Sequence, residues 1–433
     1  MSISDSYIRH RSSLRFIFVA FCLLLAAAIP SKMAASESEE EGLDVKTIIF
    51  EHLGDGYGWE VPFSHNYRIP LPVIICAEDG SWHCFSSGDL AEVHSVADPA
   101  TGKTKAHRVA VVKTIGQGST ASHFIIGNES SAHKDKLVQI FPLSPEEQAQ
   151  VDAKVAELSA AGDFKPAKTP IDGFIYVDGK YYREYRPFDI SITKNVAALF
   201  IAVILVMLIV FGMGRYYRKN GLKAPTGAKG FFEVIFNFIY NDTIKATLGE
   251  KAPKFAPYLL TAFFFILVMN LVGLIVIFPG GANLTGNIAV TLVLALCTFI
   301  LTNVFGSKHY WKDIFWPDVP IWLKCPLPIM QLIEVFGMFT KPAALCVRLF
   351  ANMMGGHMIV ITLTLLIFIF TAFGVAATSA SVVLSVAFSI FMLLLDTLVS
   401  FIQAYVFTLL STIFIGLAQA HEEHKEHPAV EPN

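Results

Sequence analysis

Hydrophobic and polar positions divide this chain into two unlike parts. From residue 36 to 190, short apolar runs alternate with polar residues, as in an ordinary water-soluble domain. After Asn195, the chain consists mostly of long apolar runs that contain few ionisable residues. The pattern therefore predicts one domain in water, residues 36–190, followed by one domain in lipid, residues 191–420.

Turn residues in the first part separate segments with different periodicities. Alternating apolar and polar residues, or runs of β-branched residues, predict strands at 71–76 and 107–112. Residues 144–162 predict a helix with a charged face. The histidines of this part are scattered without metal-ligand spacing, and we find no catalytic constellation. We expect a small α+β or mostly β domain with a binding or assembly role.

Three ordinary spans open the apolar part. They cover residues 195–214, 257–278 and 288–305, with an amphipathic interfacial helix at 230–248 and a tight turn at 279–281. An interfacial loop with Lys308, Lys312 and Lys324 follows the third span.

Two longer apolar stretches then follow, at residues 328–370 and 382–420. At about 1.5 Å per residue, each is roughly twice as long as the bilayer core is thick. Two spans in each stretch would fit the length, but neither stretch has a polar loop in its middle. We therefore expect two long, strongly tilted helices that form a hairpin with its turn at 378–381, the first bent by Pro342. The fold class is a membrane all-α bundle of about five transmembrane segments with a periplasmic domain.

Charge at the N-terminus and after the first span predicts the orientation. Arginines precede an apolar run at 16–29, which is typical of a signal peptide over residues 1–35, although an uncleaved anchor helix is the alternative. Five basic residues between 215 and 229 directly follow the first span and indicate the cytoplasmic side. Both signals place residues 36–190 in the periplasm.

Composition excludes some function classes. The chain has 433 residues, of which 54% are hydrophobic and 16% charged, and its net charge of -3 does not favour nucleic acid. It has no CxxC and no metal-ligand cluster, and we expect no cofactor. Cys76 and Cys84 flank a turn and could form a disulfide across a hairpin, or remain two free thiols.

Ionisable and amide side chains stand out within the two long stretches, where burial in lipid is expensive. A single such residue could be a snorkelling or paired structural charge, but a set on two neighbouring helices indicates function. The set comprises Glu334, Lys341, Arg348, Asn352, His357, Asp396 and Gln403.

Helical spacing separates these residues into two environments. Steps of seven place Glu334, Lys341 and Arg348 on one stripe, with Asn352 beside it. His357 falls on roughly the opposite face unless the glycines at 355 and 356 distort the helix. Asp396 and Gln403 share a face of the second helix, where Asp396 could meet His357.

Arg348 lacks a counter-charge in this pattern. A guanidinium stays charged at any depth, so it needs an acidic partner. Glu334 lies roughly 21 Å away along the helix, and no acid lies within one turn. The partner of Arg348 is therefore expected on another chain.

Three segments carry a family resemblance. Residues 340–357 read TKPAALCVRLFANMMGGH, residues 401–411 read FIQAYVFTLLS, and residues 278–291 read FPGGANLTGNIAVT. They resemble the signatures of ATP synthase subunit a, and the resemblance covers about residues 190–420. The long exported domain departs from the compact family pattern and is similar to the extended N-terminus of one bacterial branch.

The resemblance implies a role for each matching residue. Arg348 matches the arginine that faces the rotating c-ring, while Asn352 and Gln403 match polar neighbours along its approach. His357 and Asp396 match the pair of the outer half-channel, in the order found in mitochondrial members, with Asp at 396 in place of the more familiar Glu or His. Glu334 and Lys341 match further polar positions on the first long helix.

The function implied is that of a non-catalytic, proton-conducting stator subunit of a rotary F-type ATP synthase. Its partners would be the c-ring, the peripheral-stalk b subunit, the remaining synthase subunits and membrane lipid, in the bacterial inner membrane. Its short polar tail, residues 421–433, would be cytoplasmic. Protons are a better expectation than sodium ions. A secondary transporter would show an inverted repeat, which we do not find, and a receptor would need a cytoplasmic signalling domain.

Overall fold

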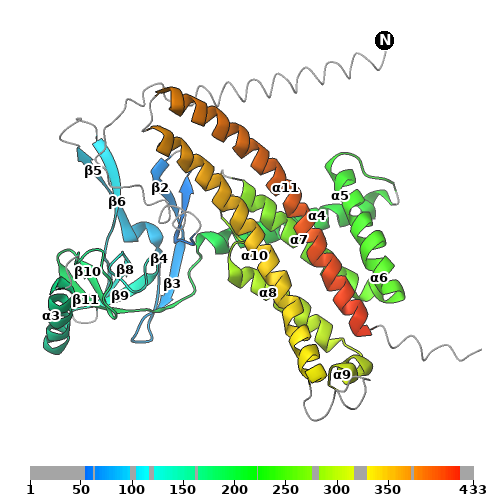
Figure 1. The fold of residues 1–433 in the computed structure, drawn as a ribbon, viewed down its shortest axis with the longest axis horizontal. Coiled ribbons are helices and arrows are strands. Elements are labelled where there is room, and N and C mark those ends of the chain that lie inside the picture. The colour runs from blue at the N-terminus through cyan, green and yellow to red at the C-terminus, as the bar shows by residue number, and fades with distance from the viewer. Residues whose placement is uncertain are drawn as a thin grey trace, which may run out of the picture. The chain divides into compact units, whose positions relative to one another are not determined.

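The computed structural model describes residues 54–61, 64–97, 104–116, 121–160, 164–221, 223–275, 282–315, 329–371 and 375–419. Along the chain, a strand-rich part precedes a helical part (Figure 1). The predicted signal peptide, the turn at 279–281 and the tail at 421–433 lie outside the described residues.

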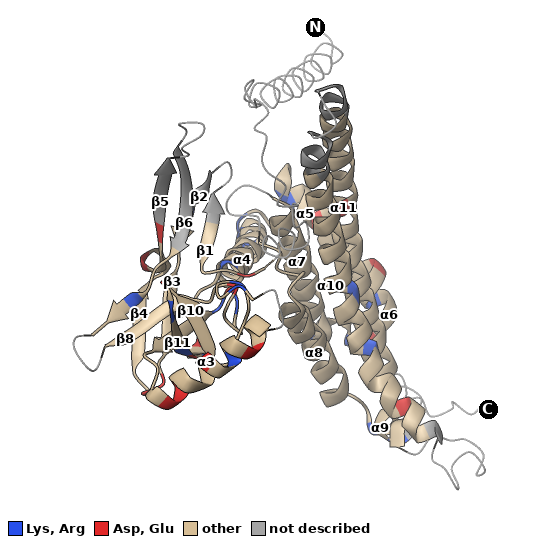
Figure 2. Cartoon of the chain, turned by 60° about the vertical axis from the view of Figure 1, so that its left-hand side comes forward, with Lys and Arg blue, Asp and Glu red and all other residues tan. Residues whose placement is uncertain are grey.

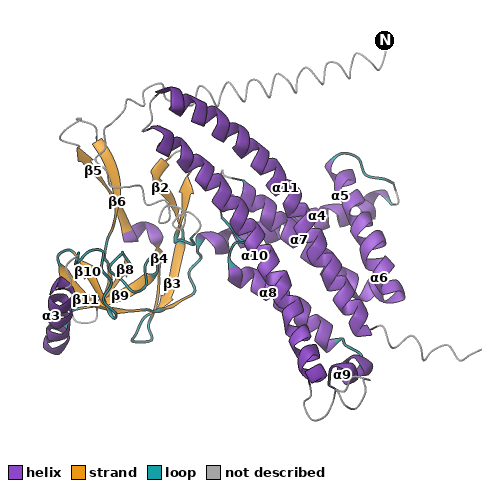
Figure 3. Ribbon diagram, viewed as in Figure 1, coloured by secondary structure: helices purple, strands orange, loops and turns teal. Residues whose placement is uncertain are grey.

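The strand-rich part consists of antiparallel strands and one long helix (Figure 3). A five-stranded sheet has the order β10-β11-β9-β8-β7, a three-stranded sheet the order β12-β3-β4, and two hairpins pair β1 with β2 and β5 with β6. The bounds are β1 Gly58–Val61, β2 Ser64–Pro70, β3 Pro72–Cys76, β4 Trp82–Ser86, β5 Ala91–Ala97, β6 Thr104–Ala110, β7 Lys113–Ile115, β8 Ser122–Ile126, β9 Leu137–Phe141, α3 Pro145–Ala160, β10 Phe174–Val177, β11 Lys180–Tyr185 and β12 Phe188–Asp189, with a 3-10 turn at Ser87–Leu90. This agrees with the expected mostly β domain.

Alternating side chains build the core of this part. Val73 and Ile75 of β3 are fully buried and pack with Leu90 and Phe124, as the two-residue period of a strand requires. The buried residues of this part form several small hydrophobic clusters rather than one large core.

Cys76 and Cys84, for which a disulfide and two free thiols were both open, lie on one hairpin and are not bonded. The register pairs Cys84 with Ile74 and Cys76 with Trp82, so the two cysteines are diagonal rather than facing neighbours. Both thiols are free.

A capping box begins α3. The Ser144 backbone N–H donates to Glu147 Oε2 at 2.8 Å, and the Glu147 N–H donates back to Ser144 Oγ at 3.3 Å. This exchange satisfies N–H groups that the first turn of a helix leaves unpaired. It explains why the helix begins at Pro145, with proline in the first turn, where no N–H is needed.

The helical part contains the five expected spans. Its elements are α4 Lys194–Asn220, α5 Ala228–Asn237, a π-helical segment Phe238–Lys245, α6 Ala246–Leu248, a 3-10 turn Gly249–Lys251, α7 Ala252–Leu274, α8 Ile288–Val304, α9 Lys308–Phe315, α10 Ile329–Thr371 and α11 Val375–Gln419. Among the described residues, four helical stretches are long and apolar enough to cross a membrane, within Lys194–Asn220, Ala228–Leu274, Gln331–Leu363 and Ser381–Gln419. The fifth, α8, is apolar but has 17 residues.

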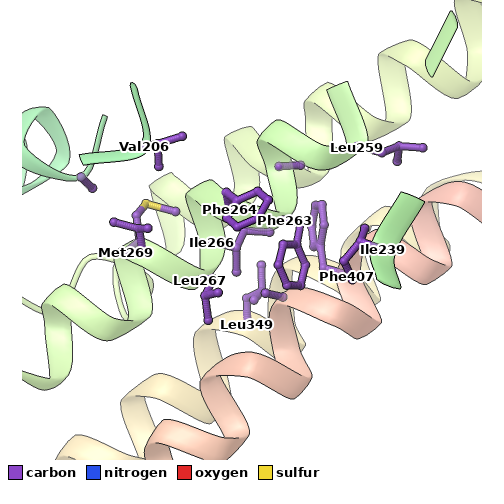
Figure 4. Close-up of a cluster of buried hydrophobic side chains, with 14 of the residues drawn as sticks. Val206, Ile239, Leu259, Phe263, Phe264, Ile266, Leu267, Met269, Leu349 and Phe407 are labelled. Carbon is purple, nitrogen blue, oxygen red and sulfur yellow. The ribbon is translucent and has the colours of Figure 1, made fainter. Parts of the chain in front are cut away.

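Helix α7 is the centre of this bundle. It is apolar on nearly all sides, and α4 and α11 lie against it. Figure 4 shows Phe263, Phe264 and Leu267 of α7 among Leu349 of α10 and Phe407 of α11. A helix that is apolar all round is expected in the interior of a bundle.

The two long helices are continuous, as predicted. Helix α10 has 43 residues and runs through Pro342, and α11 has 45 residues. The predicted turn at 378–381 is wrong, because these residues lie inside α11. Small alanine and serine residues fit a helix as readily as a turn, so these residues do not show where α10 ends and α11 begins. The predicted interfacial helix at 230–248 is helical but contains the π-helical segment.

Candidate functional site

The helical bundle has two ends, which we call the Lys194 side and the Lys308 side after the lysines found there. On the Lys194 side, α4, α8 and α11 begin and α7 and α10 end. On the Lys308 side, α9 begins directly after α8 ends, and the Ser307 N–H donates to Ala418 O near the end of α11 at 2.9 Å. The candidate residues of α10 are spread between these two sides.

Arg348 lies near the middle of α10 and is exposed. Its neighbours Leu345 and Leu349 are buried in the bundle, and they lie about 60° and about 100° around the helix axis from Arg348, on an adjacent side of the helix. Within the described ranges, Arg348 makes no hydrogen bond and no ion pair. That its acidic partner belongs to another chain stays a prediction.

His357 points into the bundle. Helix α10 passes through Gly355 and Gly356 without a break, so His357 falls on a different face from Arg348, as predicted. Its Nε2 is buried and has no hydrogen-bond partner among the described residues, and it lies 3.8 Å from the position that a Cβ on Gly273 of α7 would occupy. The imidazole therefore reaches from α10 toward α7.

Asp396 lies against the residue next to His357. A Cβ on Gly356 would be 2.8 Å from Asp396 Oδ1 and 2.9 Å from Oδ2. The absence of a side chain at Gly356 thus lets a carboxylate of α11 approach α10. No hydrogen bond or ion pair between Asp396 and His357 is present among the described residues, so the two groups are neighbours but not directly bonded.

Further polar residues line the same region. Thr285 Oγ1 donates to Asn270 Oδ1 at 2.8 Å, Asn270 Nδ2 donates to Ser400 O at 3.5 Å, and Ser400 Oγ donates to Asp396 O at 2.6 Å. Asn270 and Thr285 are buried. This chain of hydrogen bonds connects α7, the segment before α8, and the backbone of Asp396.

Lys194 adds a buried charge on this side. It occupies the first position of α4, is only 8% exposed, and its ammonium acts electrostatically on His357. Its backbone N–H donates to Gly56 O at 2.8 Å. We name Lys194, Asn270, Thr285, His357 and Asp396 the Lys194-side cluster.

A second polar region lies toward the Lys308 side. A cavity of about 30 Å³, enough for about one water molecule, is lined by polar groups of α8, α9 and α10, among them Thr298, Asn303, Tyr310 and Lys341. The Lys341 ammonium also lies 5.8 Å from the centre of the Phe414 ring. Burial, and then the nearby carboxylate of Glu334, raise the pKa of Tyr310. The predicted residue Lys341 thus lines this cavity, and Glu334 lies near Tyr310, which also lines it.

Asn352 and Gln403 are half-buried on α10 and α11. Their amides make no hydrogen bond with the part of the chain that the structure describes. Ionisable residues as a whole are sparse on α7, α8, α10 and α11 and frequent on the strand-rich part (Figure 2). Among the described residues, no group of three or more His, Cys, Asp or Glu is arranged to hold a metal.

Sequence reasoning missed the polar residues that the other helices contribute. Asn270 is a lone amide within the apolar second span, and Lys194 immediately precedes the first. Both were visible as polar residues at or within a span. Nothing in the spacing connected them with His357, because the contacts join different helices.

These features define an α-helical, multi-pass membrane protein with ionisable side chains among its spanning helices. The family model for the ATP synthase A chain matches residues 196–416. A model described as a domain of unknown function matches residues 48–136.

Curated relatives of this chain indicate the same family as the family model. The chain is 44% identical over 248 residues to ATP synthase subunit a of Chloroherpeton thalassium, covering 56% of this chain and 70% of the relative. It is 38% identical over 351 residues to that of Chlorobium phaeobacteroides strain BS1, covering 78% and 90%. It is 41% identical over 257 residues to that of Myxococcus xanthus, covering 57% and 80%. The chain belongs to the ATP synthase subunit a family, the non-catalytic, proton-translocating membrane subunit of the F-type ATP synthase.

Proposed function

We propose that this chain provides two separate proton half-channels to the c-ring and keeps them apart with Arg348. The observation that carries the proposal is the exposed guanidinium of Arg348, which has no acidic partner among the described residues. His357 follows it by nine residues along α10 and Lys341 precedes it by seven, which is about 14 Å and about 10 Å of helical rise. The guanidinium therefore lies between the two polar regions.

In this mechanism a proton reaches the Lys194-side cluster and passes Asp396 and His357. It neutralises a carboxylate of the c-ring, which can then move through lipid because it carries no charge. After nearly a full turn, the carboxylate releases the proton near Glu334 and Lys341. Imidazole and carboxyl groups suit such a relay because burial and neighbouring charges adjust their proton affinities.

Arg348 has two tasks in this scheme. Its permanent charge stabilises the ionised rotor carboxylate at close approach. The same charge repels a proton that would cross directly from one half-channel to the other. Asn352 and Gln403 would line the approach of the rotor carboxylate, where they would contribute polarity without charge.

The orientation and the wider assembly belong to this proposal. Arg215, Arg218 and Lys219 at the end of α4 favour the cytoplasm, which puts residues 36–190 and the Lys194 side in the periplasm. Residues 1–35 act as a signal peptide, residues 191–420 form the membrane domain, and residues 421–433 are a cytoplasmic tail. The stator position also requires the peripheral-stalk b subunit as a partner.

Replacing Arg348 by alanine tests the proposal. In inverted membrane vesicles, the Arg348→Ala complex should assemble and hydrolyse ATP but show no ATP-driven acidification, because the rotor carboxylate loses its counter-charge. Gln403→Ala serves as the matched control, since removal of a neutral amide should leave most of the pumping. Normal pumping by the assembled Arg348→Ala complex would refute the mechanism.

A further inference from the structure

One face of the sheet β12-β3-β4 is apolar and uncovered. We name it the outer face and define it by Ile74, Cys76, Trp82, Cys84, Phe188 and Ile190. Trp82, Phe188 and Ile190 are 58%, 66% and 55% exposed, respectively. Contiguous apolar patches are uncommon on a surface that faces water only.

The strand register shows that these side chains share one face. Cys76 of β3 is opposite Phe188 on one side and Trp82 on the other, and Ile74 is opposite Cys84. Ile190 continues the line beyond β12, where its N–H donates to Ile74 O at 3.0 Å. The rings of Trp82 and Phe188 meet edge to face with centroids 6.4 Å apart.

The opposite face of the same sheet is the domain core. Val73 and Ile75 are fully buried there, and Asp189 Oδ2 accepts a 2.5 Å hydrogen bond from the buried Tyr57 hydroxyl. Burial raises the pKa of Tyr57, and the hydrogen bond to Asp189 adds to the shift, so the hydroxyl remains a neutral donor. A sheet with a complete core on one face does not need apolar residues on its other face for folding.

The outer face leads directly into a membrane-spanning helix. The Ile192 N–H donates to Pro72 O at 3.1 Å, which holds this segment beside β3. Thr193 then caps α4, which begins at Lys194. Ile190 is therefore four residues from the start of a span, or at most about 14 Å even in an extended chain.

We propose that the outer face lies in the lipid–water interface of the bilayer and anchors the strand-rich domain to the membrane surface. Trp and other aromatic residues favour the headgroup level of a bilayer. Apart from the indole N–H of Trp82 and the weakly polar thiols, the side chains of this face offer no hydrogen-bonding group to a specific protein partner. The covalent tether at α4 keeps the face close to the bilayer, so even weak insertion is favoured.

Charged residues bound the face rather than interrupt it. Glu78 and Asp79 occupy the β3–β4 turn, and Ser81 holds Asp79 through two hydrogen bonds that lower the pKa of its carboxyl group. Arg186 is exposed just before β12. These charges remain at the headgroup level while the apolar side chains between them reach the acyl boundary. The inference depends on the spanning nature of α4 and not on the proton mechanism.

Cys84 offers a probe site within the face. We would keep Cys84 as the single cysteine of the intact synthase, attach a nitroxide spin label, and reconstitute the complex in phosphatidylcholine–phosphatidylglycerol vesicles. Collision rates with oxygen, which enters lipid, and with a neutral nickel chelate, which stays in water, report the depth of the label. The matched control is a label at Ala153→Cys, an exposed position on α3.

The expected ratio of oxygen to nickel collisions is several-fold higher at Cys84 than at the α3 control. Equal ratios at the two sites would overturn the proposal, and so would a Cys84 label shielded from both reagents, which would indicate a covering protein. Trp82→Glu with Phe188→Glu should lower the ratio at Cys84 to the control value. ATP-driven pumping of each labelled complex, measured separately, shows whether the proton mechanism itself is affected.

A second measurement needs no substitution. The natural complex is reconstituted with a phospholipid that carries a photoreactive diazirine near its headgroup, and adducts are mapped by mass spectrometry. Adducts should occur in residues 72–86 and 186–192 and be absent from α3. Their absence from both segments, with normal adducts on α4, would overturn the proposal.

Discussion

The close approach of Asp396 to Gly356 makes a single methyl group an informative perturbation. In Gly356→Ala, the new Cβ would lie 2.8 Å from Asp396 Oδ1, whereas an ordinary contact begins at 3.4 Å. The carboxylate must therefore withdraw from α10 by about 0.6 Å, mainly by rotation of its short side chain. Alanine in a helix is favoured over glycine by about 1 kcal/mol, which offsets a repacking cost of similar size. We expect normal assembly.

Activity should respond more strongly than stability. Displacement of a reacting group by about 1 Å can reduce a rate by about 100-fold, so a shift of about 0.6 Å should reduce ATP-driven proton pumping by about tenfold. Fluorescence quenching of a pH-sensitive dye in inverted vesicles measures this rate. Gly355→Ala is the matched control, because no described residue beyond its immediate neighbours in α10 comes within 4 Å of its added Cβ, and it should pump normally.

The double variant gives the sharpest result. If Gly356→Ala acts only by moving the carboxylate, then Gly356→Ala combined with Asp396→Ala should pump no less than Asp396→Ala alone. Wild-type pumping by Gly356→Ala, or an equal loss in Gly355→Ala, would refute this account of the site.

Two further outcomes are expected. His357→Ala and Asp396→Ala should each slow proton transport, and their double variant should lose less than the product of the single effects if both serve one relay; independent effects in the same vesicle assay would contradict this. Ser144→Ala should raise hydrogen exchange in the first turn of α3 about fivefold, corresponding to about 1 kcal/mol. The hydrogen bonds from Ser144 lower the pKa of Glu147, so its stabilising contribution is present above the ordinary carboxyl pKa and is lost as the pH falls through the lowered value. Exchange that is unchanged by the substitution at neutral pH would exclude the capping role.

Long apolar runs predicted the two long helices because length is a strong signal in lipid. The 43 residues of α10 and the 45 of α11 leave no polar loop to break either helix, and unpaired backbone groups are not tolerated in a bilayer core. The position of the break between α10 and α11 was mispredicted, since serine and alanine at 378–381 are compatible with both helix and turn.

The candidate site was predictable only within each helix. Periodicity separated His357 from Arg348, because both lie on one helix and their angular positions follow from 3.6 residues per turn. It could not predict that Asp396 rests against Gly356, or that Asn270 connects Thr285 with Ser400, since these contacts depend on how separate helices meet. The register that pairs Phe188 of β12 with Cys76 of β3 likewise joins strands that are more than a hundred residues apart.

The length of α10 also has a consequence for the order of events at the rotor. A straight helix of 43 residues is about 65 Å long, while the bilayer with its headgroups is only about 45 Å thick. A helix held within those limits extends about 45 Å or more sideways, so residues at different depths also occupy different places in the membrane plane. In the proposed mechanism, a rotor carboxylate that moves past α10 in that plane would leave the Lys341 region, pass Arg348, and then reach the region that His357 supplies from inside the bundle. The lateral position of each residue along α10 would therefore set the order in which the rotor carboxylate reaches these regions.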